Sequence, residues 1–237
     1  MLKLPKAIIF DTDNTLYNYF PSHNYAIKKV ALELKALKKI SNKTFDKTYT
    51  KSRKIIKKRL NDTASSHSRI LYFQTMIEIL FDKTDAKLSL HLEEVYWHEF
   101  FKKSKLFDGV IEFLKLLKYK NIKIANLTDL TSQIQFKKLV HFKIDKYFDF
   151  IVTSEEAGKD KPNILPFKLI IKKMKIPPKK IWMIGDNPKS DIEGASRVGF
   201  TKIQILHSGV KLINSKKTSP DLIFKKYSEL IKIIKKI

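Results

Sequence analysis

Short apolar segments alternate with helical patterns along most of this chain, and this alternation limits the fold more than any other feature. Five segments are rich in β-branched and aromatic residues and lack regular polar alternation: residues 6–10, 122–127, 148–152, 181–184 and 202–206. Such segments are typical of strands buried on both faces of a parallel sheet. Between them, apolar residues recur at helical spacing, as at Val110, Phe113, Leu114 and Leu117. The sequence therefore predicts an α/β fold with a Rossmann-like core, in which helices flank a parallel sheet.

Residues 18–106 interrupt the alternation of strands and helices. Three apolar stripes at helical spacing occur there, within residues 27–37, 70–80 and 88–101, and no strand pattern separates them. We predict a helical insert after the first strand, so that residues 1–17 and 107–237 form the core domain and residues 18–106 a separate helical domain.

The strong positive charge is a weaker guide to function than its size suggests. The net charge is +24, and all but four of the 48 basic residues are lysines, spread over both predicted domains. Arginine is the preferred residue for base edges and phosphates, and no block resembles a basic arm. We interpret the surplus as solvated lysines, which disfavours a nucleic-acid partner. Binding to polyanions remains the alternative, because so basic a surface attracts them.

Three further features bear on location and assembly. The chain has no cysteine, so it carries no disulfide and no thiolate metal site. Its apolar runs are too short to span a bilayer, and the first strand begins too early to leave room for a signal peptide. We expect a cytoplasmic protein without membrane association, present as a monomer or a weak homodimer.

Acidic and hydroxyl residues follow three of the predicted strands. These residues are Asp11 and Asp13, Thr128 and Asp129, and Asp186 with Asp191 shortly after. Open parallel sheets bind ligands at the carboxyl ends of their strands, where these side chains would converge. Clustered carboxylates repel one another unless a cation lies among them, which predicts a Mg²⁺ site with oxygen ligands. Lys161 could supply positive charge for an anionic substrate.

Four segments resemble, in order, the motifs of the haloacid dehalogenase superfamily. The segments are Asp11-Thr12-Asp13-Asn14-Thr15, Asn126-Leu127-Thr128, the stretch 154–162 that ends in Lys161-Pro162, and Gly185-Asp186-Asn187-Pro188-Lys189-Ser190-Asp191. Two positions depart from the common pattern: Asn14 stands where glycine is frequent, and Asp129 replaces the asparagine that often follows the second motif. The resemblance covers residues 6 to about 206. It implies a phosphatase-like member with a C1-type helical cap at residues 18–106.

The resemblance also implies a role for each motif residue. Asp11 would be the nucleophile that forms an aspartyl-phosphate, and Asp13 the general acid and base. Thr128 and Lys161 would hold the phosphoryl oxygens, with Asp129 beside them. The implied ligands of Mg²⁺ are Asp11, Asp13 through its backbone carbonyl, Asp186 and Asp191. The alternatives for Thr128 and Asp191 are caps of the helices that follow them.

The polar segment 61–69 is the leading candidate for substrate selection within the implied cap. His67 and Arg69 could hold a second anionic or hydroxylated part of the substrate, and Tyr17 could line the entrance. The alternative for Arg69 is the first turn of a helix.

The resulting hypothesis is a Mg²⁺-dependent phosphatase that acts on a small phosphorylated metabolite. A sugar phosphate, a phosphorylated acid and a nucleoside monophosphate all fit it. Asp13 favours phosphate esters over halides by resemblance, because dehalogenases lack this acid. The alternatives are a phosphomutase of the β-phosphoglucomutase type and a non-catalytic polyanion-binding protein.

Overall fold

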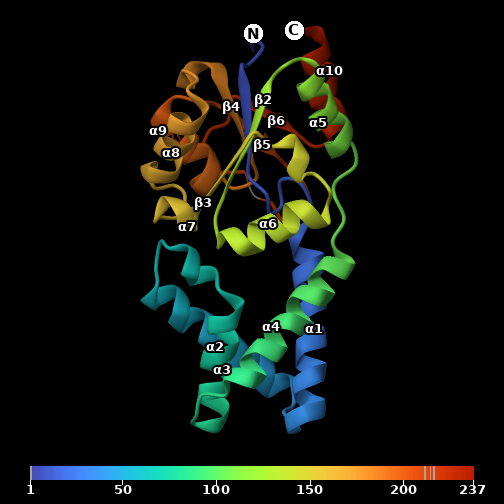
Figure 1. Ribbon diagram of the computed structural model, residues 1–237, viewed down its shortest axis with the longest axis vertical. Coiled ribbons are helices and arrows are strands. Elements are labelled where there is room, and N and C mark those ends of the chain that lie inside the picture. The colour runs from blue at the N-terminus through green and yellow to red at the C-terminus, as the bar shows by residue number, and fades with distance from the viewer. Residues whose placement is uncertain (1, 211, 214, 216) are drawn as a thin grey trace. The chain divides into compact units, whose positions relative to one another are not determined.

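The chain forms two compact units in the computed structural model, which describes residues 2–210, 212–213, 215 and 217–237 (Figure 1). The core unit comprises Met1–Asn18 and Lys105–Ile237, and the helical unit comprises Tyr19–Ser104. Within the described residues, no helix is long and apolar enough to cross a membrane.

The core unit is built on a six-stranded parallel sheet with the strand order β3-β2-β1-β4-β5-β6. The strands are β1 (Ala7–Phe10), β2 (Lys123–Thr128), β3 (Phe150–Thr153), β4 (Ile181–Gly185), β5 (Thr201–Ile205) and β6 (Leu222–Phe224). The four side chains of β1 are completely buried, as expected for the central strand of a sheet covered on both faces. The sequence pattern located the first five strands to within two residues at their starts. It missed β6, whose three residues are too few to show periodicity.

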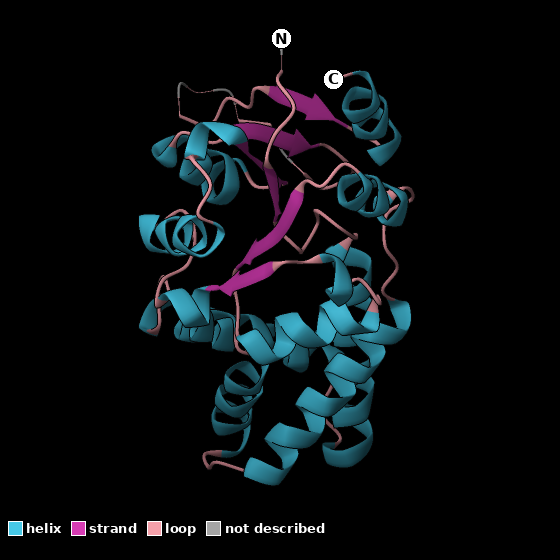
Figure 2. Cartoon of the chain, turned by 45° about the horizontal axis from the view of Figure 1, so that its top comes forward, coloured by secondary structure: helices cyan, strands magenta, loops and turns pink. Residues whose placement is uncertain are grey.

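Helices cover both faces of this sheet, as Figures 1 and 2 show. They are α5 (Val110–Tyr119), α6 (Ser132–His141), α7 (Ser154–Ala157), α8 (Ile164–Met174), α9 (Gly194–Val198) and α10 (Tyr227–Lys236). Phe167, Ile170 and Met174 of α8 join the core on one face, and α5 packs against α10 on the other. This three-layer arrangement confirms the predicted α/β class with a Rossmann-like core.

The helical unit consists of four helices and one short 3₁₀ turn. The elements are α1 (Tyr19–Lys38), α2 (Asn42–Arg59), the turn Ala64–His67, α3 (Arg69–Phe81) and α4 (Ala86–Lys103). Helix α1 packs against α4, and α2 against α3. The sequence analysis did not identify α2. Its buried face alternates apolar residues such as Phe45 and Ile56 with Thr48 and Ser52, so no apolar stripe is visible.

Candidate active site

The strand order places a ligand-binding edge beside β1. The sheet extends through β2 and β3 on one side of β1 and through β4, β5 and β6 on the other, so the order reverses between β1 and β4. Ligands bind in α/β sheets outside the carboxyl ends of the strands at such a reversal. Asp11 directly follows β1, and Asp186 directly follows β4.

Both carboxylate oxygens of Asp11 receive hydrogen bonds. The Lys161 ammonium lies 2.7 Å from Oδ1, and the Thr15 hydroxyl donates to Oδ2 at 3.1 Å. Burial raises the pKa of Asp11 to about 7, although the charge of Lys161 opposes the rise. The two bonds orient the carboxylate, as a nucleophile requires.

Lys161 links Asp11 to Asp191. Its ammonium also lies 2.7 Å from Oδ1 of Asp191, a side chain that is almost completely buried. Burial lowers the pKa of Lys161, but the charges of Asp11 and Asp191 outweigh it and hold this pKa well above its usual value. The other oxygen of Asp191 accepts a hydrogen bond from the backbone N–H of Asn187 at 3.0 Å.

The close approach of Asp191 to β4 requires a glycine at position 185. A Cβ at Gly185 would lie 2.3 Å from Oδ2 of Asp191, which is far inside van der Waals contact. Asp191 lies inside a π-helical turn, Pro188–Glu193, whose N-cap is Asn187. Asp191 is therefore not the helix cap that the sequence left open as an alternative.

Three carboxylates of the core unit can meet at one point. Oxygen atoms of Asp11, Asp186 and Asp191 lie within 4.8 Å of one another. Burial, followed by the charges of Asp11 and Asp191, raises the pKa of Asp186 well above its usual value. One ammonium, that of Lys161, faces these three acids, so they fit a hard divalent cation with oxygen ligands. The carboxylate of Asp13 is not part of this cluster.

The carboxylate of Asp13 instead contacts Lys138 and Tyr17. The ammonium of Lys138 lies 2.7 Å from each of its oxygens, and the Tyr17 hydroxyl donates to Oδ1. Lys138 is completely buried and lies on α6, together with Ile134 and Leu139 on its buried face. The sequence analysis missed Lys138 because lysines are so numerous. Its position four residues after Ile134 on an apolar face was the available signal.

Tyr17 lies in the core unit, on the side of the domain boundary where the sequence placed it. Its side chain is completely buried, and its ring lies 5.0 Å from that of Phe142 between centroids. Its hydroxyl contacts Asp13, whereas its position at the entrance stays a prediction.

Thr128 is the last residue of β2, and Asp129 follows it at the same edge. Thr128 is 2% exposed, and its hydroxyl donates only a long bond, 3.4 Å, to the carbonyl of Asp129. The Asp129 carboxylate accepts a bond from the backbone N–H of Lys161 at 2.9 Å, and burial raises its pKa to about 6. Helix α6 has Thr131 as its N-cap, so Thr128 does not cap it.

His67 and Arg69 belong to the helical unit. His67 ends the 3₁₀ turn, and Arg69 is the first residue of α3, as the structural alternative had it. Arg69 is nevertheless buried, with 8% of its surface exposed, and is not part of a solvated loop.

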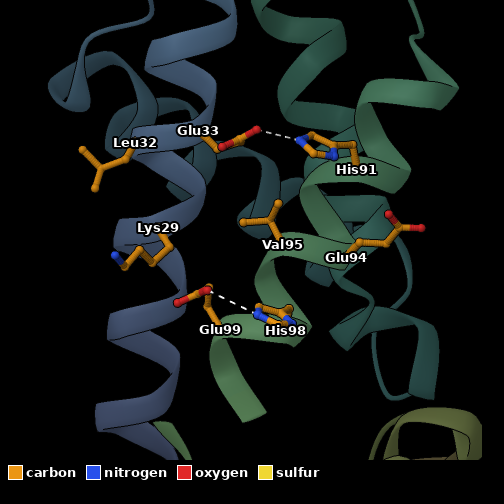
Figure 3. Close-up of a pocket in the computed structure, with 8 residues that line it drawn as sticks. All are labelled: Lys29, Leu32, Glu33, His91, Glu94, Val95, His98 and Glu99. Atoms are coloured by element: carbon orange, nitrogen blue, oxygen red, sulfur yellow. Dashed lines mark hydrogen bonds and ion pairs between the residues drawn. The ribbon is translucent and has the colours of Figure 1, made fainter. Parts of the chain in front are cut away.

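The helical unit also contains a pocket of about 580 Å³ between α1 and α4 (Figure 3). Four of its polar residues form two pairs: His91 lies 2.7 Å from Glu33, and His98 lies 3.7 Å from Glu99. The remaining lining residues are Lys29, Leu32, Glu94 and Val95. This pocket contains none of the predicted site residues.

Comparison with known proteins identifies relatives of the chain. The profile of the haloacid dehalogenase-like hydrolases matches residues 8–205. A ribulose-1,5-bisphosphate 5-phosphatase of Halopiger xanaduensis is 34% identical over 200 residues, which cover 83% of each chain. A glyceraldehyde 3-phosphate phosphatase of Methanocaldococcus jannaschii is 26% identical over 98% of each chain.

Solved structures share the fold. A phosphatase of Thermococcus onnurineus superposes with a TM-score of 0.72 at 24% identity, covering 96% of this chain and 97% of the other. A 2-haloacid dehalogenase of Pseudomonas syringae superposes with a TM-score of 0.76 at 21% identity, covering 98% and 99%. The predicted family and enzyme class are thus confirmed: the chain belongs to the haloacid dehalogenase-like hydrolases.

Proposed function

We propose that this protein is a Mg²⁺-dependent phosphatase that hydrolyses a small phosphorylated metabolite through an aspartyl-phosphate. The observation that carries the proposal is the arrangement at the end of β1. Asp11 is held through both oxygens beside a cluster of acids, and Asp13, two residues later, is held separately. The curated relatives are named as phosphatases of phosphorylated sugars, which supports the same class of substrate.

In the first step, a carboxylate oxygen of Asp11 attacks the phosphorus atom in line with the ester oxygen. The phosphorus–oxygen ester bond breaks as the acyl-phosphate bond forms. Asp13 donates a proton to the departing alcohol. Lys161 balances the charge on the phosphoryl oxygens, and the Thr128 hydroxyl donates a hydrogen bond to one of them.

In the second step, Asp13 accepts a proton from a water molecule that attacks the phosphorus atom. The acyl-phosphate bond breaks, inorganic phosphate leaves, and the carboxylate of Asp11 is restored. Lys138 and Tyr17 keep the Asp13 carboxylate in one orientation for both proton transfers.

The metal ligands in this proposal are Asp11, Asp186, Asp191 and the backbone carbonyl of Asp13. A bound Mg²⁺ would reduce the repulsion between the anionic nucleophile and the anionic substrate. The neighbouring acids fit such an ion, since the ammonium of Lys161 offsets only part of their mutual repulsion.

The test is phosphate release from a panel of phosphorylated metabolites, with Mg²⁺ or with a chelator, by the native protein and Asp11→Asn. We expect release that requires Mg²⁺ and is lost in Asp11→Asn. Asp145→Asn, a change at an exposed acid of the core unit, is the matched control and should retain activity. A folded protein that releases no phosphate from any compound would contradict the proposal.

The phosphomutase alternative rests on the same pair of acids. A mutase would return the phosphoryl group to its substrate, require a bisphosphate activator, and give an isomer without net phosphate release. Measurement of the isomer and of free phosphate in one assay separates these activities.

We further propose that the helical unit is the substrate-selecting cap, with Arg69 as its principal contact and His67 beside it. Its position in the sequence, inserted between Asn18 and Lys105, supports this role. An Arg69→Met variant should then change the order of preferred substrates more than it changes the rate on any single small phosphate ester.

A further inference from the structure

The helical unit contains two arginines that form no ion pair with a carboxylate among the described residues; Arg69 is buried and Arg53 is half-buried. Arg53 lies on α2, and Arg69 begins α3. Ion pairs of this unit include those of His91 with Glu33 and of His98 with Glu99, and within the described part of the unit neither guanidinium takes part in one. A buried charge without a partner is costly, so the arrangement requires an explanation.

Arg69 is enclosed by neutral groups. Its Nη1 donates to the backbone carbonyl of His67 at 2.6 Å, and its Nη2 donates to the hydroxyl of Tyr19. The guanidinium carbon lies 5.1 Å from the ring centroid of Tyr96 and 5.7 Å from that of Trp97. Aromatic rings attract the positive charge of a guanidinium. They do not accept hydrogen bonds from the N–H groups that point outward in the plane of the guanidinium itself.

Arg53 shares this aromatic environment. Its guanidinium carbon lies 5.8 Å from the ring centroid of Tyr49 and 5.9 Å from that of Tyr72, and Arg69 lies 5.6 Å from the same Tyr72 ring. Two positive side chains from different helices therefore contact one tyrosine. Two positive charges that share one ring repel each other, and an anion between or beside them would offset this repulsion.

Three buried polar atoms of this group have no hydrogen-bond partner among the described residues. They are Nε of Arg53, Nε of Arg69 and the hydroxyl oxygen of Tyr49. Buried donors in folded proteins are almost always paired, so several unpaired ones in one place indicate a missing acceptor. All three groups can donate, and two of them carry positive charge, which is the complement of an oxyanion.

The pKa of the neighbouring His23 is consistent with the same positive potential. Burial, followed by the charges of Arg69 and Arg53, lowers the pKa of His23 to about 3. Its Nδ1 lies 2.8 Å from the hydroxyl of Tyr96, and its ring stacks on that of Tyr19. The positive charges of Arg69 and Arg53 therefore add to the effect of burial at His23.

We propose that the helical unit binds an oxyanion, a phosphate or a carboxylate group, through Arg53, Arg69 and Tyr49. Guanidinium groups bind both anions with paired N–H donors, and a tyrosine hydroxyl adds a third. The bound oxyanion is either the second anionic group of the substrate or free phosphate. The first source rests on the proposed function and narrows the substrates to bisphosphates and phosphorylated acids.

Direct binding is tested first, by the fluorescence of Trp97 in the full-length Trp182→Phe protein. Trp97 and Trp182 are the two tryptophans, so the remaining signal comes from the ring beside Arg69. Asp11→Asn is added to the same protein so that no ester is hydrolysed. We expect inorganic phosphate and a pentose 1,5-bisphosphate to shift this fluorescence, and Arg53→Met to weaken the response at least tenfold. The absence of any shift with either probe would overturn the proposal.

Steady-state kinetics then separate the two sources. The quantity to compare is the ratio of kcat/KM for the pentose 1,5-bisphosphate to kcat/KM for the pentose 5-phosphate. If the substrate supplies the anion, this ratio falls about tenfold in Arg53→Met and in Arg69→Met. If free phosphate supplies it, the ratio stays unchanged while the fluorescence response is lost.

Two control variants distinguish a loss of anion binding from a general effect of the net charge or of misfolding. Arg59→Met removes one positive charge from an exposed position of the same helix α2 and should change neither the fluorescence response nor the ratio. Arg69→Lys retains the charge and should keep part of the response if Arg69→Met does not fold. An equal effect of Arg59→Met and Arg53→Met would overturn the proposal. The fluorescence assay measures binding without turnover. It can therefore support the anion site even if the protein hydrolyses no ester and the proposed function fails.

Discussion

At the scale of single residues, the two acids that follow β1 have different partners. Asp11 contacts Lys161 and Thr15, whereas Asp13 contacts Lys138 and Tyr17. In the proposed mechanism a nucleophile and a proton donor require different surroundings, and the separate partners would provide them. The sequence predicted the two acids and Lys161, whose motifs are local, but not Lys138, which lies 125 residues from Asp13.

Replacement of Lys138 by methionine should lower kcat at least tenfold, because the Asp13 carboxylate would lose the ammonium that contacts both of its oxygens. Lys137→Met, at the exposed neighbouring position, is the control. The loss should be large for alkyl phosphates and small for 4-nitrophenyl phosphate, whose leaving group needs no proton. Equal losses on both substrates would assign Lys138 a structural role only.

Replacement of Gly185 by alanine should inactivate the enzyme, because the added Cβ would displace the Asp191 carboxylate. Overpacking of this kind costs about 1–3 kcal/mol of stability. Gly158→Ala is the matched change: its φ is +78°, and no atom lies within 4 Å of the added Cβ. We expect that variant to lose stability but keep its activity. Thermal melting and phosphate release measure the two effects, and an active Gly185→Ala enzyme would contradict the placement of Asp191.

At the scale of elements, the helices predicted from the sequence have apolar buried faces, whereas the helix that was missed has a partly polar one. Helices α5 and α8 present uninterrupted apolar stripes and were predicted from them. Helix α2 buries Thr48 and Ser52, whose hydroxyls bond to backbone carbonyls of the same helix at 2.8 Å, so its buried face reads as polar. A buried polar residue whose hydroxyl bonds to a carbonyl of its own helix does not contribute to an apolar pattern, so hydrophobic periodicity does not detect it.

The contact of α1 with the arginines of α2 and α3 predicts a pH dependence of stability. His23 has a pKa of about 3 in the folded protein and about 6.5 when unfolded, so the unfolded chain binds one proton more between these values. Stability should therefore fall as the pH drops below about 6.5, by up to about 1.4 kcal/mol per pH unit from this group. The groups facing His23 are Arg53, Arg69 and Tyr96.

Denaturant unfolding at several pH values between 7 and 4.5 measures this dependence. His23→Gln retains a polar side chain and should remove most of the slope. His91→Gln changes a more exposed histidine that pairs with Glu33, and should not remove it. If His23→Gln unfolds with the same pH slope as the native protein, the low pKa of His23 is contradicted.

At the scale of the whole molecule, a cluster of acids persists within a chain of net charge +24. The overall charge favours anions at the surface, yet Asp11, Asp186 and Asp191 converge in an arrangement that fits a cation. The sum of charges over the sequence is thus a poor guide to the potential at the site.

Addition of Mg²⁺ should stabilise the protein. A ligand at one hundred times its Kd adds about 2.7 kcal/mol when it binds only the folded state. The melting temperature should rise in MgCl₂ relative to NaCl of equal ionic strength. Asp186→Asn should abolish most of this rise, whereas Asp145→Asn, at an exposed acid, should retain it. An equal rise in both variants would place the metal elsewhere.

The sequence by itself determined the α/β class, the first five strands and the four motif segments, because each depends on short-range patterns of burial and chemistry. Only the tertiary structure decided which charges meet. The contact of Lys138 with Asp13 and the pairing of Lys161 with Asp191 join segments that are far apart in the sequence, and the approach of Arg53 to Tyr72 joins two different helices. Such contacts depend on helix packing and strand order, which bring together residues that no local pattern relates.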